Sequence, residues 1–126
     1  MFETDPHKPR VLLVTRDKEL AGDYLSWLGA DYQVVTVDSD RALRRELGRG
    51  TGTVVMVERK ESPLGAEMPD LVDAALDDGF RVIRLADNTG LFDARWNKKM
   101  IHLPLGVRPK VLLAAIKGLH TRLAEN

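Results

Sequence analysis

The stretch Val11-Leu12-Leu13-Val14, followed at once by Thr15-Arg16-Asp17, determines how the rest of the sequence is interpreted. Four consecutive apolar residues are typical of a central parallel strand that is covered on both faces. The apolar positions of the next segment repeat with the spacing of one helix face: Leu20, Ala21, Tyr24, Leu25 and Leu28. Asp17 stands where an N-cap is expected, and Gly29 stands where the helix would end. The stretch therefore predicts a buried strand followed by an amphipathic helix.

The same alternation continues along the chain. Four further apolar runs predict strands at Val34–Val37, Val54–Val57, Val82–Leu85 and Met100–Leu103. Helical spacing predicts a helix between Ser39 and Gly48, a third helix with Asp70 in its first turn and Gly79 at its end, and a last one that opens near Pro109. Strands that alternate with helices imply right-handed crossovers. We therefore expect an α/β fold, a doubly wound five-stranded parallel sheet with helices on both faces.

The segment between the fourth and fifth strands departs from this regularity. Asp87 to Lys99 contains Asn88, Thr89 and Gly90, and only a thin helical pattern surrounds Phe92 and Trp96. We expect the fourth helix to be short, irregular or absent.

Length and composition exclude several classes of protein. The 126 residues fit one domain, with 44% hydrophobic and 30% charged residues. Lys plus Arg and Asp plus Glu both number 19, so the chain has no net positive charge that would favour binding to nucleic acid. Cysteine is absent, which excludes disulfide bonds and thiolate metal sites. No apolar run approaches a membrane span. We expect a cytoplasmic protein with a flexible segment at residues 1–9 and a single domain at residues 10–124.

In a doubly wound sheet the functional site lies outside the carboxyl ends of the strands. The residues that follow four of the predicted strands are therefore the candidates for the chemistry. They are Thr15, Arg16 and Asp17; Glu58; Ala86 and Asp87; and Leu103 with Pro104.

Together these features resemble the receiver domain of bacterial response regulators, a flavodoxin-like fold, over nearly the whole chain. The resemblance rests on the first strand with its helix, on Glu58 closing the third strand, and on the run Met100 to Pro104 before a last amphipathic helix. It implies a magnesium-binding acidic pair after the first strand, a phosphoacceptor aspartate after the third, a hydroxyl residue after the fourth and a lysine before the proline. It also implies a cis bond at Leu103–Pro104.

The sequence departs from the family at each of these positions. Thr15 and Arg16 replace the acidic pair, and Glu58 replaces the phosphoacceptor. Ala86 replaces the hydroxyl residue and Leu103 the lysine, while Met100 stands at the aromatic switch position, where ordinary strand packing explains it. A hydroxyl and a guanidinium cannot supply the carboxylates that magnesium needs. We therefore expect no catalytic residue, no metal and no cofactor, and we predict that the chain is not an enzyme.

Two interpretations of the charged residues remain open. Arg16 and Glu58 could lie within reach of each other, so that a fixed ion pair replaces the metal and the phosphoryl group. Alternatively both side chains face water. For Asp17, capping of the first helix is the simplest role.

The resemblance implies a phosphorylation-independent pseudo-receiver, a protein-interaction or dimerisation module that regulates an attached or separate output such as transcription. Homodimers would form through the face of the fourth helix, fifth strand and last helix, with Phe92, Trp96 and His102 as interface candidates. The alternative is a small flavodoxin-like domain that binds a ligand, or performs catalysis, through an unrecognised site. The partner, the pathway and the oligomeric state do not follow from the sequence.

Overall fold

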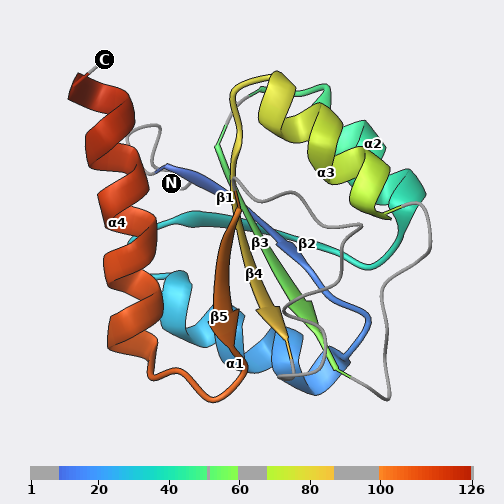
Figure 1. Cartoon of the computed structure of the whole chain (residues 1–126). Helices are drawn as coiled ribbons and strands as arrows, with labels where there is room; N and C mark the ends of the chain where they lie inside the picture. Colours follow the sequence, from blue (N-terminus) through green and yellow to red (C-terminus); the bar gives the residue numbers. More distant parts are fainter. Residues whose placement is uncertain (1–8, 51, 60–67, 87–99, 126) are drawn as a thin grey trace, which may run out of the picture.

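The computed structural model describes residues 9–50, 52–59, 68–86 and 100–125, which form one sheet with helices on both sides (Figure 1). All four strand pairings are parallel, and the strand order is β2-β1-β3-β4-β5. The strands are β1 (Arg10–Val14), β2 (Gln33–Val37), β3 (Thr53–Glu58), β4 (Arg81–Ala86) and β5 (Ile101–Pro104). The predicted five-stranded parallel sheet is confirmed.

Among the described residues, two helices cover each face of the sheet. One face packs against α1 (Lys18–Leu28) and α4 (Pro109–Glu125), and the other against α2 (Asp40–Leu47) and α3 (Met68–Asp77) (Figure 1). The doubly wound arrangement is therefore confirmed. The expected short or irregular helix lies at residues 87–99, outside the described residues. Within the described ranges, no helix has both the length and the apolar character needed to cross a membrane.

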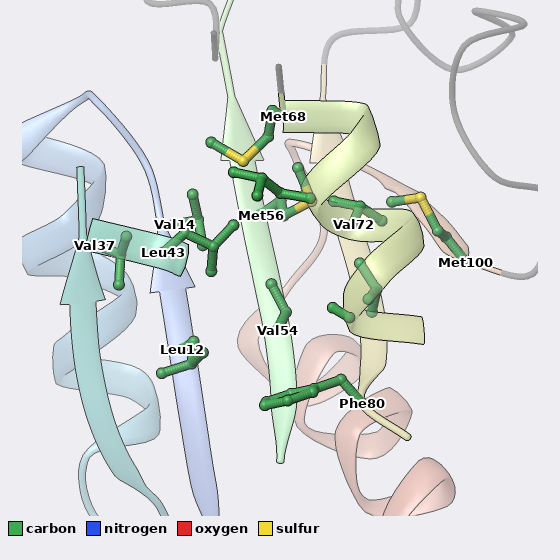
Figure 2. Packing of buried hydrophobic residues seen from close by; sticks show 13 residues of the cluster. Leu12, Val14, Val37, Leu43, Val54, Met56, Met68, Val72, Phe80 and Met100 are labelled. Atoms are coloured by element: carbon green, nitrogen blue, oxygen red, sulfur yellow. The ribbon is translucent and has the colours of Figure 1, made fainter. Parts of the chain in front are cut away.

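The alternation of side chains along the strands divides the core into two clusters. On β1, Leu12 and Val14 point toward α2 and α3, while Val11 and Leu13 point toward α1 and α4. Figure 2 shows the first cluster, in which Met56 and Val72 belong to facing elements. All four residues of the run 11–14 are 0% exposed, as expected of a central strand. The central strand β1 is therefore buried between the two clusters.

The helix boundaries follow from local hydrogen bonds. The carboxylate of Asp17 accepts from the Leu20 N–H at 3.0 Å, and the Ser39 hydroxyl accepts from the Ala42 N–H at 3.1 Å. Both side chains satisfy an amide that has no partner within its own helix. Gly79, with φ of +96°, follows α3 in a backbone conformation that favours glycine. The predicted caps are confirmed.

The end of β5 corrects two expectations. The strand covers Ile101–Pro104 rather than beginning at Met100. No cis peptide bond occurs in the described residues, so the expected cis bond at Leu103–Pro104 was wrong. In the parallel register Leu103 lies opposite Leu85 and Pro104 lies opposite Ala86.

The environment of Tyr24 predicts how the stability of the protein depends on pH. Its ring is buried, meets Trp27 edge-on with centroids 4.7 Å apart, and its hydroxyl donates to the Leu105 carbonyl at 3.5 Å. Burial raises the pKa of Tyr24, and Asp23 raises it further, while Arg59 lowers it. The pKa of Tyr32 is raised by burial and by Asp31. Both side chains therefore resist ionisation in the folded state.

A raised pKa in the folded state contributes stability that is complete below the unfolded-state pKa of about 10 and is lost as the pH rises through the folded-state value. We therefore expect the free energy of unfolding to fall in alkaline solution above about pH 10. Urea denaturation at a series of pH values measures this slope. Tyr24→Phe should flatten it, and an unchanged slope in that variant would contradict the assignment to Tyr24.

Candidate functional site at the carboxyl ends of the strands

The turn after β1 is held by Thr15. This residue is only 5% exposed, and its N–H donates to the Val37 carbonyl at 3.0 Å. Its hydroxyl accepts from the Asp17 N–H at 3.1 Å. Arg16, between them, is exposed. The turn therefore buries its hydroxyl residue and directs its arginine to the surface.

Asp17 has two roles in this turn. Besides capping α1, its Oδ2 lies 3.4 Å from Nη1 of Arg59, which follows β3 directly. The cap predicted from the sequence is confirmed, whereas the pairing with Arg59 was not foreseen. The only carboxylate of this turn is thus already bound to a helix N-terminus and to a cation.

Glu58 forms an ion pair with Arg84 on the neighbouring strand. Nη2 of Arg84 donates to Oε1 of Glu58 at 2.7 Å, a short, charge-assisted hydrogen bond. The side chain of Arg84 is 2% exposed and that of Glu58 is 18% exposed. In the parallel register Arg84 lies opposite Met56 and Ala86 lies opposite Glu58. The two charged residues are therefore diagonal neighbours on one face of the sheet, the face that packs against α2 and α3.

This geometry corrects the expected partner of Glu58. No ion pair joins Arg16 to Glu58 in the structure, so that hypothesis was wrong, although Glu58 does pair with an arginine. The physical reason is the strand pleat: Arg84 lies two residues before the end of β4, on the same face as Glu58, whereas Arg16 lies in an exposed turn. A signal was present in the sequence, because an arginine inside the apolar run Val82–Leu85 needs a buried partner.

The remaining predicted positions occupy the ends of β4 and β5. Ala86 is buried at the end of β4, next to Glu58 in register. Met100 packs in the cluster under α3, which confirms its packing role, and Leu103 packs toward α1 and α4. His102 is half-buried and lies opposite Arg84 in register. Phe92 and Trp96 lie outside the described residues.

The carboxylates of Asp17 and Glu58 at this edge are therefore each paired with an arginine. Asp17 is beside Arg59 and Glu58 is beside Arg84. Among the residues that the structure describes, no three His, Asp or Glu side chains gather as potential metal ligands. Chemically, the carboxylate that closes β3 faces a fixed guanidinium.

Comparison with known proteins identifies the fold. The chain matches a response regulator receiver protein from Sinorhizobium medicae with a TM-score of 0.73 and 20% identity, over 91% of this chain and 96% of that chain. A response regulator receiver domain protein from Clostridium thermocellum gives a TM-score of 0.76 and 17% identity, over 92% and 97%. This chain has the receiver fold. A signal receiver domain of an HD domain-containing protein from Pseudomonas fluorescens shares this receiver fold with a TM-score of 0.75 and 15% identity, over 95% and 100%. No protein-family model and no curated protein matches the sequence.

Within the receiver fold, the edge formed by the ends of β1, β3, β4 and β5 is the one that the sequence resemblance singled out. The structure brings Glu58, Ala86 and the Thr15–Asp17 turn to this edge. It also adds two residues that sequence reasoning missed, Arg59 and Arg84. The roles of these positions in a lost phosphorylation pocket remain a prediction.

Proposed function

We propose that this chain is a receiver-type signalling module that acts through protein contacts and does not depend on phosphorylation. The observation that carries the proposal is the ion pair between Arg84 and Glu58. In this proposal Glu58 stands at the phosphoacceptor position, and a guanidinium from the neighbouring strand is its permanent partner. The carboxylate is therefore engaged before any phosphodonor arrives.

The residues around Glu58 support the same conclusion. Phosphoryl transfer needs in-line attack and a metal ion that neutralises the developing charge. Thr15 and the cationic Arg16 stand where the metal-binding acids would be, and neither provides a carboxylate. Ala86 has no hydroxyl to bind a phosphoryl oxygen, and Leu103 has no charge to pair with one. Without these groups, the proposed module binds partners and performs no phosphoryl transfer.

A receiver that lacks the chemical step still has surfaces through which to act. A ligand or modification changes activity only by favouring one of two conformations. A short ion pair with one buried partner stabilises the conformation that contains it, so the module keeps one state. Its output then depends on the partner, either an attached domain or a separate protein.

The proposed partner is an attached output domain or a separate protein. The Pseudomonas neighbour is described as the receiver domain of an HD domain-containing protein, which supports an attached output for this chain as well. Regulation of transcription in the cytoplasm is one such output. The face around β5 and α4 is the proposed contact or dimerisation surface, since Val111 on α4 is a large apolar residue that is 47% exposed.

The test uses magnesium and beryllofluoride, which mimics a phosphoryl group on a carboxylate. Two-dimensional amide spectra of the full chain would be recorded during the titration. A receiver that retains the acidic pair, the phosphoacceptor aspartate, the hydroxyl residue and the lysine would be titrated in parallel as the control. We expect no saturable shifts at Glu58 or at Ala86, whereas the control receiver should show saturable shifts at the corresponding strand ends. Saturable shifts at Glu58 or Ala86 would contradict the proposal.

A small ligand-binding domain is the second candidate function. It is favoured by a cavity at the ends of β1 and β2, away from the ion pair of Glu58.

A further inference from the structure

The cavity lies between the turn after β1 and the end of β2. Its volume is about 280 Å³, and its lining is formed by Thr15, Arg16, Lys18, Ala21, Thr36, Val37 and Asp38. Because β1 separates β2 from β3 in the sheet, the cavity lies on the opposite side of β1 from Glu58 and Arg84. The cavity shares the turn residues Thr15 and Arg16 with the pocket that the resemblance to receivers indicates, but it does not include Glu58, Ala86 or Leu103.

The charges of the cavity wall favour an anion with polar substituents. Arg16 and Lys18 are exposed, and in the part of the chain that the structure describes neither takes part in an ion pair. Asp17 lies between them in the sequence, but its carboxylate binds Arg59 and the N-terminus of α1. The two cations are therefore available to a ligand. Asp38, on the other side of the cavity, contributes the only carboxylate of the lining.

A buried hydroxyl supplies an independent observation. Thr15 is 5% exposed and lines the cavity, and its oxygen already accepts from the Asp17 N–H. A hydroxyl has one proton to donate as well as lone pairs to accept with. None of the described residues accepts this proton in the structure. An anionic oxygen inside the cavity would be its natural acceptor, in line with the two cations.

Asp38 determines which kind of anion fits. A carboxylate repels a bare anion, but it accepts hydrogen bonds from hydroxyl groups. The ligand should therefore combine an anionic end with hydroxyl groups. The volume lies just below the range of about 300 to 1,000 Å³ that is usual for drug-sized ligands, so the ligand must be small.

We propose that this cavity binds a small phosphorylated polyhydroxyl compound of the sugar phosphate class. The phosphate is bound by Arg16, Lys18 and the Thr15 hydroxyl, and a sugar hydroxyl donates to Asp38. The proposal does not rest on phosphorylation independence, because Glu58 and Arg84 lie on the opposite side of β1 from the cavity and do not line it.

The experiment titrates the full chain with ribose 5-phosphate, inorganic phosphate and ribose, and follows the amide spectrum. We expect saturable shifts with ribose 5-phosphate at residues 15–21 and 36–38, with weaker binding of inorganic phosphate and no binding of ribose. Arg16→Gln and Lys18→Gln should each weaken binding of ribose 5-phosphate roughly tenfold. Asp38→Asn should weaken binding of ribose 5-phosphate but leave binding of inorganic phosphate unchanged or stronger.

Lys110→Gln is the matched control, since Lys110 is an exposed lysine on α4 that does not line the cavity. All the substituted side chains are exposed, so the remaining amide signals should stay in place and report a folded protein. Absence of saturable shifts with ribose 5-phosphate at millimolar concentration would overturn the proposal. Equal affinity for inorganic phosphate and ribose 5-phosphate would overturn the role of Asp38 and with it the sugar phosphate.

Discussion

Glu58→Gln is expected to lower the free energy of unfolding by about 3 kcal/mol, because it removes the negative charge that lies against the buried guanidinium of Arg84. Arg84 is 2% exposed and its Nη2 is 2.7 Å from Oε1 of Glu58, so water cannot easily take the place of the lost charge. The amide is nearly the same size as the carboxylate, so packing is preserved and the effect is electrostatic. Urea denaturation followed by circular dichroism measures the loss.

Two further variants make this prediction specific. Replacing both charged partners of such a pair is often neutral, so Glu58→Gln combined with Arg84→Met should recover most of the loss. Arg16→Gln is the matched control at an exposed arginine and should change stability by less than about 0.5 kcal/mol. A double variant that is no more stable than Glu58→Gln alone would show that the pair does not carry the effect.

Gly52→Ala is expected to lower the free energy of unfolding by about 2 to 3 kcal/mol through a backbone clash. A Cβ at this position would lie 2.5 Å from the carbonyl oxygen of Arg10 on β1. The carbonyl of Gly52 also accepts from the Arg81 N–H of β4 at 3.1 Å, so this hydrogen bond opposes a shift of Gly52 away from Arg10. Arg10 cannot move freely either, because its Nη2 donates to both the backbone and the side chain of Glu46.

The control for this variant is Gly22→Ala. Gly22 lies in α1, and a Cβ there would meet nothing within 4 Å. Because alanine favours a helix more than glycine does, this variant should gain about 0.5 to 1 kcal/mol. Thermal and urea denaturation of the two variants should therefore move in opposite directions. A Gly52→Ala variant as stable as the original chain would show that β1 and β3 separate easily at this point.

The elements of the fold could be predicted because their signals are local. The apolar run at residues 11–14 gives a central strand without reference to the rest of the chain, and Asp17 and Ser39 cap the helices that follow them directly. The strand order β2-β1-β3-β4-β5 depends on contacts between segments that lie far apart in the sequence, so local signals alone do not determine it.

The ion pairs could not be predicted in the same way. Contacts between side chains on two strands depend on the register of the strands and on the face to which each residue points. The sequence of a single segment determines neither of them. Attention to the residues just after the strands identified Glu58 but missed Arg84, which lies within β4. The cavity was missed for a similar reason, since Thr36 and Asp38 belong to the end of the edge strand β2, which was not among the strand ends considered.

The position of Arg84 has a consequence for the evolutionary history of such a chain. A change from Glu58 to aspartate would shorten the carboxylate side chain by one methylene and draw it away from a guanidinium that is held inside the sheet. If Glu58 stands at the phosphoacceptor position, as we propose, the first step toward a working phosphoacceptor would thus cost stability before it brought any activity. The stability cost is avoided only if Arg84 is replaced first or at the same time, so the ion pair constrains the order in which the two residues can change.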